Sequence, residues 1–307
     1  MTEAPDLPGE FERILAPMAL EQFFREHWNR RPLHVRGPAH RFIDLLNRDA
    51  FIDLLPHCGE VKAGFYDRNG WYCELPARPD QVKRLWEAGM TICAGVLPPD
   101  RRRSAVTESY RRTVAFAGDV YFNAYMSPDG HGFGLHIDDH PVFVLQVEGS
   151  KQWSISAEIG VPDPVRGFSF PPDRDRMNLP WGSFERPDAT QFLQVTLEPG
   201  DALYLPAGTW HKARAIGFSL ALTMASSRYT PLNLAQMAMM EQLDHYPALR
   251  KPIWGADTRG CTGGGVPPDL QLCFESAAAA LREWAGRLDA DALYRLWRTA
   301  IDRRDAG

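Results

Sequence analysis

Hydrophobic positions along the 307-residue chain change their spacing twice. Up to about residue 113, apolar residues recur at helical spacing, as at Leu20, Phe23 and Phe24 in "MALEQFFREHWNRRPLHVRG", before Pro32 starts a short extended segment. The period then falls to two, and the helical period returns from about residue 229. We therefore expect three regions: an N-terminal helical and β region (1–113) that buttresses a β core (114–228), and a C-terminal helical region (229–307).

The middle region has the pattern of an antiparallel β structure. "VYFNAYMSP" places Tyr121, Asn123 and Tyr125 on one face, and "VFVLQVEGSKQWSIS" is typical of a strand, a glycine-containing turn and a second strand. "FLQVTLEPGDALYLPAGTWHKA" repeats this pattern. Short strands joined by Gly and Pro turns, without helices between them, predict a barrel or jelly roll. The fold class expected is therefore mainly β, with helical flanks and a C-terminal helical segment.

A proline-rich insertion, about residues 160–183, separates the two sets of strands. It is too long for a simple hairpin connection. Loops of this length in compact domains are often lids over functional sites, and an ordinary packed surface loop is the equal alternative.

Composition and charge narrow the classes of protein. With 44% hydrophobic and 24% charged residues the chain is typical of globular proteins, and its net charge of -5 provides no basic field for nucleic acid. The run Arg101–Arg103 is more typical of a solvated helix face than of a nucleic-acid contact. Five separated cysteines without CxxC spacing, an acidic N-terminus and no membrane-length apolar run predict a reducing, cytoplasmic setting.

The stretch "GFGLHIDDHPVF" carries two histidines and two aspartates within five positions. Residues two apart on a strand face the same way, so His136 and Asp138 are expected to point together into the barrel. His211, in "PGDALYLPAGTWHKA", supplies a third candidate ligand from a later hairpin. Two histidines and one carboxylate leave coordination positions open, as in non-haem Fe(II) oxygenases, whereas a structural zinc site is closed by four ligands.

Three nearby residues compete for the metal. Asp139 has the wrong parity to join His136, and His140 precedes Pro141 at the start of a new segment; His131 is the third competitor. For these reasons we rank Asp139 and His140 as surrounding or surface residues. A lone histidine beside an apolar strand is in any case usually a hydrogen-bonded core or surface residue.

Lys151 follows the HxD strand across the turn "EGS". An Fe(II) oxygenase of this type uses a co-substrate that chelates iron, and 2-oxoglutarate does so through its keto-acid end. Its distal carboxylate requires a cation, which a return strand would supply by carrying Lys151 along the cavity wall. A solvent-facing hairpin lysine is the alternative. Asn123 and Tyr125 are candidates for further hydrogen bonds to the same ligand.

Taken together, "NAYMSPDGHGFGLHIDDHPVFVLQVEGSKQW" and "PGDALYLPAGTWHKA" resemble JmjC-type, cupin-fold 2-oxoglutarate oxygenases, with the ribosomal-oxygenase branch the most similar. The resemblance extends loosely to "FFREHWNRRPLHVRG". It implies a double-stranded β-helix core, Fe(II) bound by His136, Asp138 and His211, and 2-oxoglutarate bound by Lys151. It also implies that Asn123, Tyr125 and Ser219 contribute to co-substrate binding.

The activity implied is hydroxylation of a protein or peptide side chain or of a small molecule, with release of succinate and CO2. Two alternatives stay open: a cupin dioxygenase or isomerase that does not use 2-oxoglutarate, and a non-catalytic cupin binding module. The C-terminal helices make a homodimer the expected assembly, and no membrane association is expected.

Overall fold

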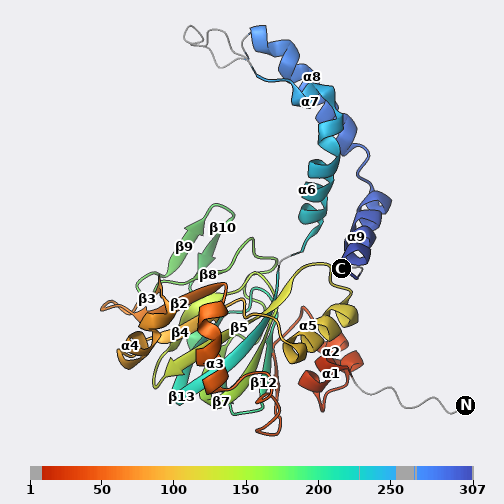
Figure 1. The fold of residues 1–307 in the computed structure, drawn as a ribbon. Coiled ribbons are helices and arrows are strands. Elements are labelled where there is room, and N and C mark those ends of the chain that lie inside the picture. Colours follow the sequence, from red (N-terminus) through yellow and green to blue (C-terminus); the bar gives the residue numbers. More distant parts are fainter. Residues whose placement is uncertain (1–8, 228, 254–265, 267, 306–307) are drawn as a thin grey trace, which may run out of the picture. The chain divides into compact units, whose positions relative to one another are not determined.

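Two units make up the part of the chain that the computed structural model describes, residues 9–227, 229–253, 266 and 268–305 (Figure 1). The larger unit holds the residues up to 114 together with 118–228, and the smaller unit holds 115–117 together with the residues from 229.

The larger unit is built on an antiparallel sheet of eleven strands, counted over the described residues. Eight strands follow the order β1-β12-β7-β13-β5-β4-β2-β3, with β11 paired to β7 and the short β8 joined through β6 to β13. A hairpin of β9 and β10 stands apart from this sheet. The strands are β1 Leu33–Val35, β2 Glu60–Tyr66, β3 Tyr72–Pro76, β4 Thr91–Gly95, β5 Val120–Pro128, β6 Gly132–Ile137, β7 Val142–Ile155, β8 Phe168–Ser169, β9 Arg176–Leu179, β10 Gly182–Glu185, β11 Leu193–Leu197, β12 Ala202–Leu205 and β13 His211–Ser226.

The turn expected at "EGS" is absent, because β7 continues through it as one strand of 14 residues. β13 pairs with β7 on both sides of this point, so the extra residues are absorbed as bulges with register shifts between Ile216 and Ser219 and between Leu220 and Ala221. Gly149 takes a left-handed φ of 62°, and a Cβ atom there would lie 1.9 Å from the Phe218 carbonyl oxygen. The expectation of a return strand was therefore wrong.

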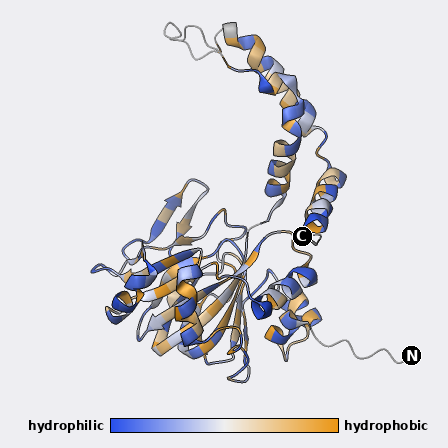
Figure 2. Ribbon diagram, in the orientation of Figure 1, coloured by the Kyte–Doolittle hydropathy of each residue, from blue (hydrophilic) through white to orange (hydrophobic). Residues whose placement is uncertain are grey.

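Short helices flank the sheet of the larger unit (Figure 1). The helix and strand expected around "LEQFF" and "PLHV" are confirmed as α2 and β1. Figure 2 shows that the central strands are largely hydrophobic, whereas the helices alternate hydrophobic and hydrophilic residues. The helices are α1 Glu10–Leu15, α2 Leu20–Glu26, α3 Arg48–Leu54, α4 Val82–Glu87 and α5 Arg101–Val114, with single 3₁₀ turns at Leu55–His57, Pro79–Gln81 and Ala189–Gln191.

An aromatic cluster attaches the N-terminal helices to the outer face of the sheet. Phe11 of α1 meets Phe143 of β7 edge to face with ring centroids 5.2 Å apart, and Phe23 of α2 meets Tyr204 of β12 at 5.0 Å. Such pairs contribute beyond the apolar area that they bury. β7 is therefore buried on both faces, with Phe143 outside and its neighbours Val142 and Val144 inside.

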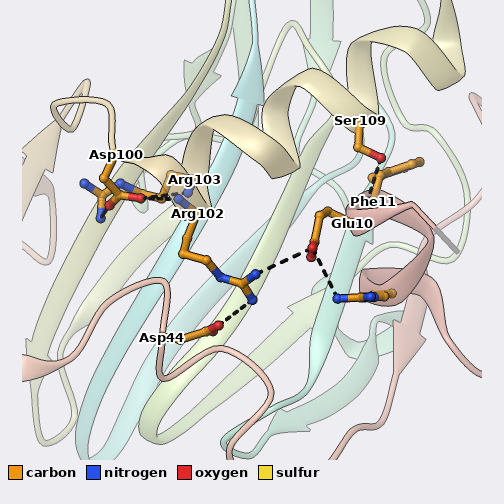
Figure 3. Close-up of polar contacts among 8 residues, drawn as sticks. Glu10, Phe11, Asp44, Asp100, Arg102, Arg103 and Ser109 are labelled. Atoms are coloured by element: carbon orange, nitrogen blue, oxygen red, sulfur yellow. Dashed lines mark hydrogen bonds and ion pairs between the residues drawn. The ribbon is translucent and has the colours of Figure 1, made fainter. Parts of the chain in front are cut away.

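Polar contacts join α1, α5 and the segment before α3 (Figure 3). The Phe11 N–H donates to the Ser109 hydroxyl at 3.1 Å, and the Arg102 guanidinium lies between the carboxylates of Glu10 and Asp44. Arg103 departs from the solvated face expected for the arginine run: it is buried and donates to the carbonyl oxygens of Leu45 and Pro98.

Part of the proline-rich insertion is packed into the core. Val161 and Phe170 are buried in one cluster with Trp210, and β8 of this insertion pairs with β6 so that Ser169 lies opposite His136. The insertion therefore covers the strand that carries the HxD sequence.

The smaller unit is helical among its described residues. The Trp284 indole N–H donates to the Gln242 amide oxygen at 3.1 Å, and Arg303 pairs with Glu241 at 2.8 Å. Several large apolar side chains stay exposed, including Leu232, Met240, Leu272 and Tyr294. The helices are α6 Pro231–Gln242, α7 Pro247–Arg250, α8 Pro268–Ala285 and α9 Ala290–Asp305, with a 3₁₀ turn at Leu243–His245.

None of the helices in the described ranges has the length and apolar character needed to cross a membrane.

Candidate metal centre

The sheet brings His136, Asp138 and His211 together. His136 lies near the end of β6, Asp138 follows that strand directly, and His211 is the first residue of β13. Antiparallel pairing places His136 opposite His211, and one ligand atom from each of the three side chains lies within 4.8 Å of the others. Two imidazoles and one carboxylate thus converge on one point from two adjacent strands.

Both imidazoles are oriented by backbone carbonyl groups two residues upstream. The Nδ1 atom of His136 lies 2.7 Å from the Gly134 oxygen, and that of His211 lies 2.8 Å from the Thr209 oxygen. A carbonyl oxygen only accepts hydrogen bonds, so each Nδ1 carries a proton and each Nε2 is the nitrogen left to bind a metal. This support of the distal nitrogen is typical of metal-ligating histidines.

Burial keeps His211 neutral. It lowers the pKa of this imidazole to about 4, and the nearby His136 ring acts in the same direction, while Asp138 opposes them. The 3.5 Å contact between the His211 Nε2 atom and the Asp138 carboxylate is therefore not an ion pair at neutral pH. Two electron-pair donors face each other there without a proton to share, an arrangement that a cation between them would satisfy.

The competing residues stand outside this cluster. The His140 Nδ1 atom lies 2.9 Å from the Asp139 carboxylate, so these neighbours pair with each other. His140 nonetheless contributes to the cavity wall, whereas His131 does not.

A cavity of about 140 Å³ extends from the three residues into the barrel. Its wall is mixed, with aromatic and aliphatic side chains between the polar ones. It is lined by Tyr121, Asn123, Tyr125, Phe133, His136, Asp138, His140, Val142, Val144, Lys151, Trp153, His211, Ala221, Thr223 and Ala225.

Lys151 lies in this cavity wall and is 2% exposed. The bulges of β7 reverse the alternation of its side chains, which brings Lys151 to the same side as Val144. Its Nζ donates to the Ser127 hydroxyl at 3.1 Å, and among the described residues it forms no ion pair with a carboxylate. Burial lowers the pKa of this ammonium to about 8, so it is largely protonated at neutral pH.

Asn123 and Tyr125 also line the cavity, as their shared parity predicts. The Asn123 amide oxygen accepts the Val96 N–H at 2.8 Å, which leaves its NH2 group as the donor. Burial raises the pKa of Tyr125 well above its ordinary value, so this phenol stays protonated. Ser219 is fully buried, contacts Gln146 at 3.0 Å and is not part of the cavity wall.

Ser127, Thr91 and Trp153 did not emerge as site residues from the sequence. Ser127 accepts the hydrogen bond of the Lys151 ammonium, and Thr91 donates to the same Ser127 hydroxyl at 3.2 Å. Trp153 lies beside His211. Ser127 continues the period of two from Tyr125, and Trp153 has the parity of Lys151, so these two could have been found. Thr91 belongs to another strand, and its sequence context carries no such signal.

An antiparallel cupin fold that brings two histidines and one carboxylate together is the arrangement that the resemblance to JmjC-type proteins implies. Residues 98–234 match the family model described as "JmjC domain". The resemblance of the sequence to JmjC-type oxygenases of the ribosomal-oxygenase branch and the predicted fold class are thereby confirmed.

Among curated proteins, the chain is 29% identical to Ribosomal oxygenase 1 of Gallus gallus over 261 residues, which is 78% of this chain and 41% of that protein. It is 24% identical to the uncharacterized protein YxbC of Bacillus subtilis (strain 168), over 76% of this chain and 75% of that one. The chain thus spans less than half of the chicken relative. Among solved structures, YcfD, a ribosomal oxygenase from Escherichia coli in complex with cobalt and 2-oxoglutarate, has the same fold, with a TM-score of 0.60, 16% identity and coverage of 93% of this chain and 71% of that one.

Proposed function

We propose that this protein is an Fe(II)- and 2-oxoglutarate-dependent oxygenase that hydroxylates a protein or peptide side chain or a small molecule. The observation that carries the proposal is the joint presence, in one cavity, of the cluster His136, Asp138 and His211 and of the buried Lys151 ammonium. The JmjC match and the 2-oxoglutarate bound in the YcfD structure support it.

The three residues fit Fe(II) by the chemistry of their donors. His136 and His211 offer imidazole Nε2 atoms, and the Asp138 carboxylate would partly balance the charge of a divalent cation. A set of two histidines and one carboxylate leaves coordination positions open. When bound, iron and 2-oxoglutarate supply the activation of O2, with succinate and CO2 as the products of the co-substrate.

Lys151 is the group that distinguishes a 2-oxoglutarate site from a general metal site. The Lys151 ammonium is buried and pairs with no carboxylate of the described residues, so it has lost its hydration free energy. Its hydrogen bond to the Ser127 hydroxyl restores little of that free energy. A carboxylate arriving from the cavity would make a charge-assisted hydrogen bond with it. Lys151 would thus hold the distal carboxylate, and the Asn123 amide and Tyr125 hydroxyl would donate to the same ligand.

The chain's other contribution is exclusion of water and orientation. Val142, Val144 and Trp153 line the same cavity as Lys151 and the histidines and form an apolar part of its wall. A dry, preorganised cavity strengthens each polar contact to a bound ligand.

The test is anaerobic addition of Fe(II) and then 2-oxoglutarate to metal-free protein, monitored by the visible metal-to-ligand charge-transfer band. We expect a band that His136→Ala abolishes and that Lys151→Ala shifts to much higher 2-oxoglutarate concentration. His131→Ala is the matched control, because His131 lies in the same segment but outside the cluster, and it should retain the band.

Each other outcome selects an alternative. Iron bound at one per chain without a band would overturn 2-oxoglutarate dependence in favour of another cupin metalloenzyme. No iron binding would overturn the metal centre and leave a binding module.

Assembly and location are proposals of the same kind. The exposed apolar side chains of the smaller unit, such as Leu272 and Met240, support a homodimer through the C-terminal helices. The test is to compare the molar masses of Leu272→Glu and of the parent chain by light scattering. The thiols of Cys58, Cys73, Cys93 and Cys273 are free, which supports a cytoplasmic location.

A further inference from the structure

A second cavity, of about 580 Å³, lies in the larger unit on the other side of β5 from the metal cavity. Met126 of β5 lines it, whereas its neighbour Tyr125 lines the metal cavity. Two short helical segments form the sides. The cavity is lined by Arg48, Ile52, Leu55, Pro56, Pro79, Asp80, Val82, Lys83, Trp86, Met126 and Phe218.

The interior of this cavity is apolar. Leu55, Val82 and Met126 are buried beneath it, and the rings of Trp86 and Phe218 meet edge to face with centroids 5.8 Å apart. Ile52 is 46% exposed at its side, although it is a large aliphatic residue. The volume of this cavity and its apolar lining match those of binding sites for small ligands, which are mostly apolar with a few precisely placed polar groups.

Positive charge dominates the rim. The Arg48 guanidinium lies 3.8 Å from the centre of the Phe218 ring, and it has no ion pair with another residue of the described ranges. Lys83 is highly exposed and has only a distant partner, Glu87, at 3.9 Å. The one acid in the wall, Asp80, is held by the Arg78 guanidinium at 3.1 Å.

We propose that this cavity binds a small amphiphilic carboxylate, a molecule with an apolar body and one anionic end. The apolar body would cover Ile52, Trp86 and Phe218, and the carboxylate would pair with the Arg48 guanidinium. Stacking on Phe218 holds the fork of Arg48 at the rim, where it can form two parallel hydrogen bonds to a carboxylate. A neutral or cationic molecule of the same shape would leave Arg48 without a partner.

The cavity adjoins the segment of β7 that leads to Lys151. The Arg48 backbone N–H donates to the Glu148 carboxylate at 2.9 Å, and the Phe218 carbonyl lies directly against Gly149. Two of the residues that would hold the ligand therefore contact the bulge that precedes Lys151. The proposal does not depend on the metal or on 2-oxoglutarate.

The test uses the full, metal-free chain and the fluorescent probe 1-anilinonaphthalene-8-sulfonate, which is itself an apolar anion. We expect saturable binding of the probe, displaced by decanoate below its micellar concentration, with decanol and decylammonium at least tenfold weaker. Arg48→Gln should weaken decanoate about tenfold or more, while Arg101→Gln, which changes an exposed arginine elsewhere, should not.

A second pair of variants tests the apolar wall. Ile52→Glu places a carboxylate in the wall and should abolish decanoate binding, whereas Ile43→Glu changes an equally exposed isoleucine outside the cavity and should preserve it. Circular dichroism confirms that each variant is folded. Equal displacement by decylammonium, or unchanged decanoate binding in Ile52→Glu, would overturn the proposal. Because no metal is present, that outcome would leave the proposed oxygenase function untouched.

Discussion

The Nζ atom of Lys151 lies 3.1 Å from the Oγ atom of Ser127, and the Lys151 side chain lines the same cavity as His136, Asp138 and His211. Ser127 in turn accepts a hydrogen bond from Thr91, so the ammonium contacts one hydroxyl group that a second hydroxyl supports, and no carboxylate of the described residues pairs with it. Its charge is therefore left available for an anionic ligand, at a cost in stability to the ligand-free protein.

This cost predicts a pH-dependent effect on folding. Burial lowers the Lys151 pKa from 10.5 to about 8, so the unfolded chain holds this proton more tightly than the folded protein does. Protonation then favours unfolding, and stability rises as pH increases from about 8 to 10.5. Urea unfolding measures this effect. The free energy of unfolding of the parent chain, relative to that of Lys151→Met, should rise by about 3 kcal/mol over this pH window.

Other groups also titrate between pH 8 and 10.5. Their contributions cancel in the difference between the unfolding free energies of the parent chain and of Lys151→Met. A difference between the two proteins that stays constant from pH 7 to 10.5 would show that Lys151 is not a buried, protonated ammonium.

The same titration predicts how co-substrate binding depends on pH. Once the ammonium loses its proton above pH 8, the affinity for 2-oxoglutarate should fall by roughly tenfold for each pH unit. Anaerobic titration of the charge-transfer band between pH 7 and 9 measures this. 2-Oxobutanoate chelates iron in the same way but lacks the distal carboxylate, so its affinity should not show the added decline. Parallel profiles for the two acids would contradict the role of Lys151.

Asp138→Ala should weaken retention of Fe(II) by more than about 100-fold, because loss of a single group that merely supports a ligand already costs 10-fold to 100-fold. The measurement is iron content per chain after anaerobic desalting. Asp139→Ala changes the adjacent carboxylate, which lies outside the cluster, and should retain iron. Equal loss in both variants would argue against Asp138 as the specific ligand.

The neighbours Arg102 and Arg103 should differ sharply in their effect on stability (Figure 3). Arg103→Met leaves the buried carbonyl group of Leu45 and the partly buried one of Pro98 without donors and should lower the free energy of unfolding by about 3 kcal/mol. The Arg102 side chain is 47% exposed, so Arg102→Met should cost less than about 1 kcal/mol despite its two acidic partners. Urea unfolding of both variants checks this, and similar losses would refute the assignment of Arg103 to the core.

Much of the fold was accessible from the sequence because its signals are local. Alternation at Tyr121, Asn123 and Tyr125 follows from the strand period alone and places all three in one cavity. The path of β7 was not accessible, because "EGS" is compatible with a turn. Only pairing with β13 on both sides of Gly149 makes it a bulge.

The residues of the site likewise differ in whether local sequence signals could predict them. His136 and Asp138 are two residues apart, and the hairpin pattern before His211 indicates a second strand, so their proximity was predictable. Their assignment as iron ligands stays a prediction, as does the role of Ser219, which the structure places against Gln146. The Ser127–Thr91 pair joins strands 36 residues apart, and side-chain contacts at that separation leave no periodic trace.

The strand β5 separates two chambers by the thickness of a single backbone, since Tyr125 faces one and Met126 the other. A substitution that displaces this backbone therefore disturbs both chambers at once and cannot report on either separately. Genetic dissection has to use the residues that touch one chamber alone. Ile52 and Arg48 meet that condition for the apolar cavity, and Asp138 and Lys151 meet it for the metal cavity.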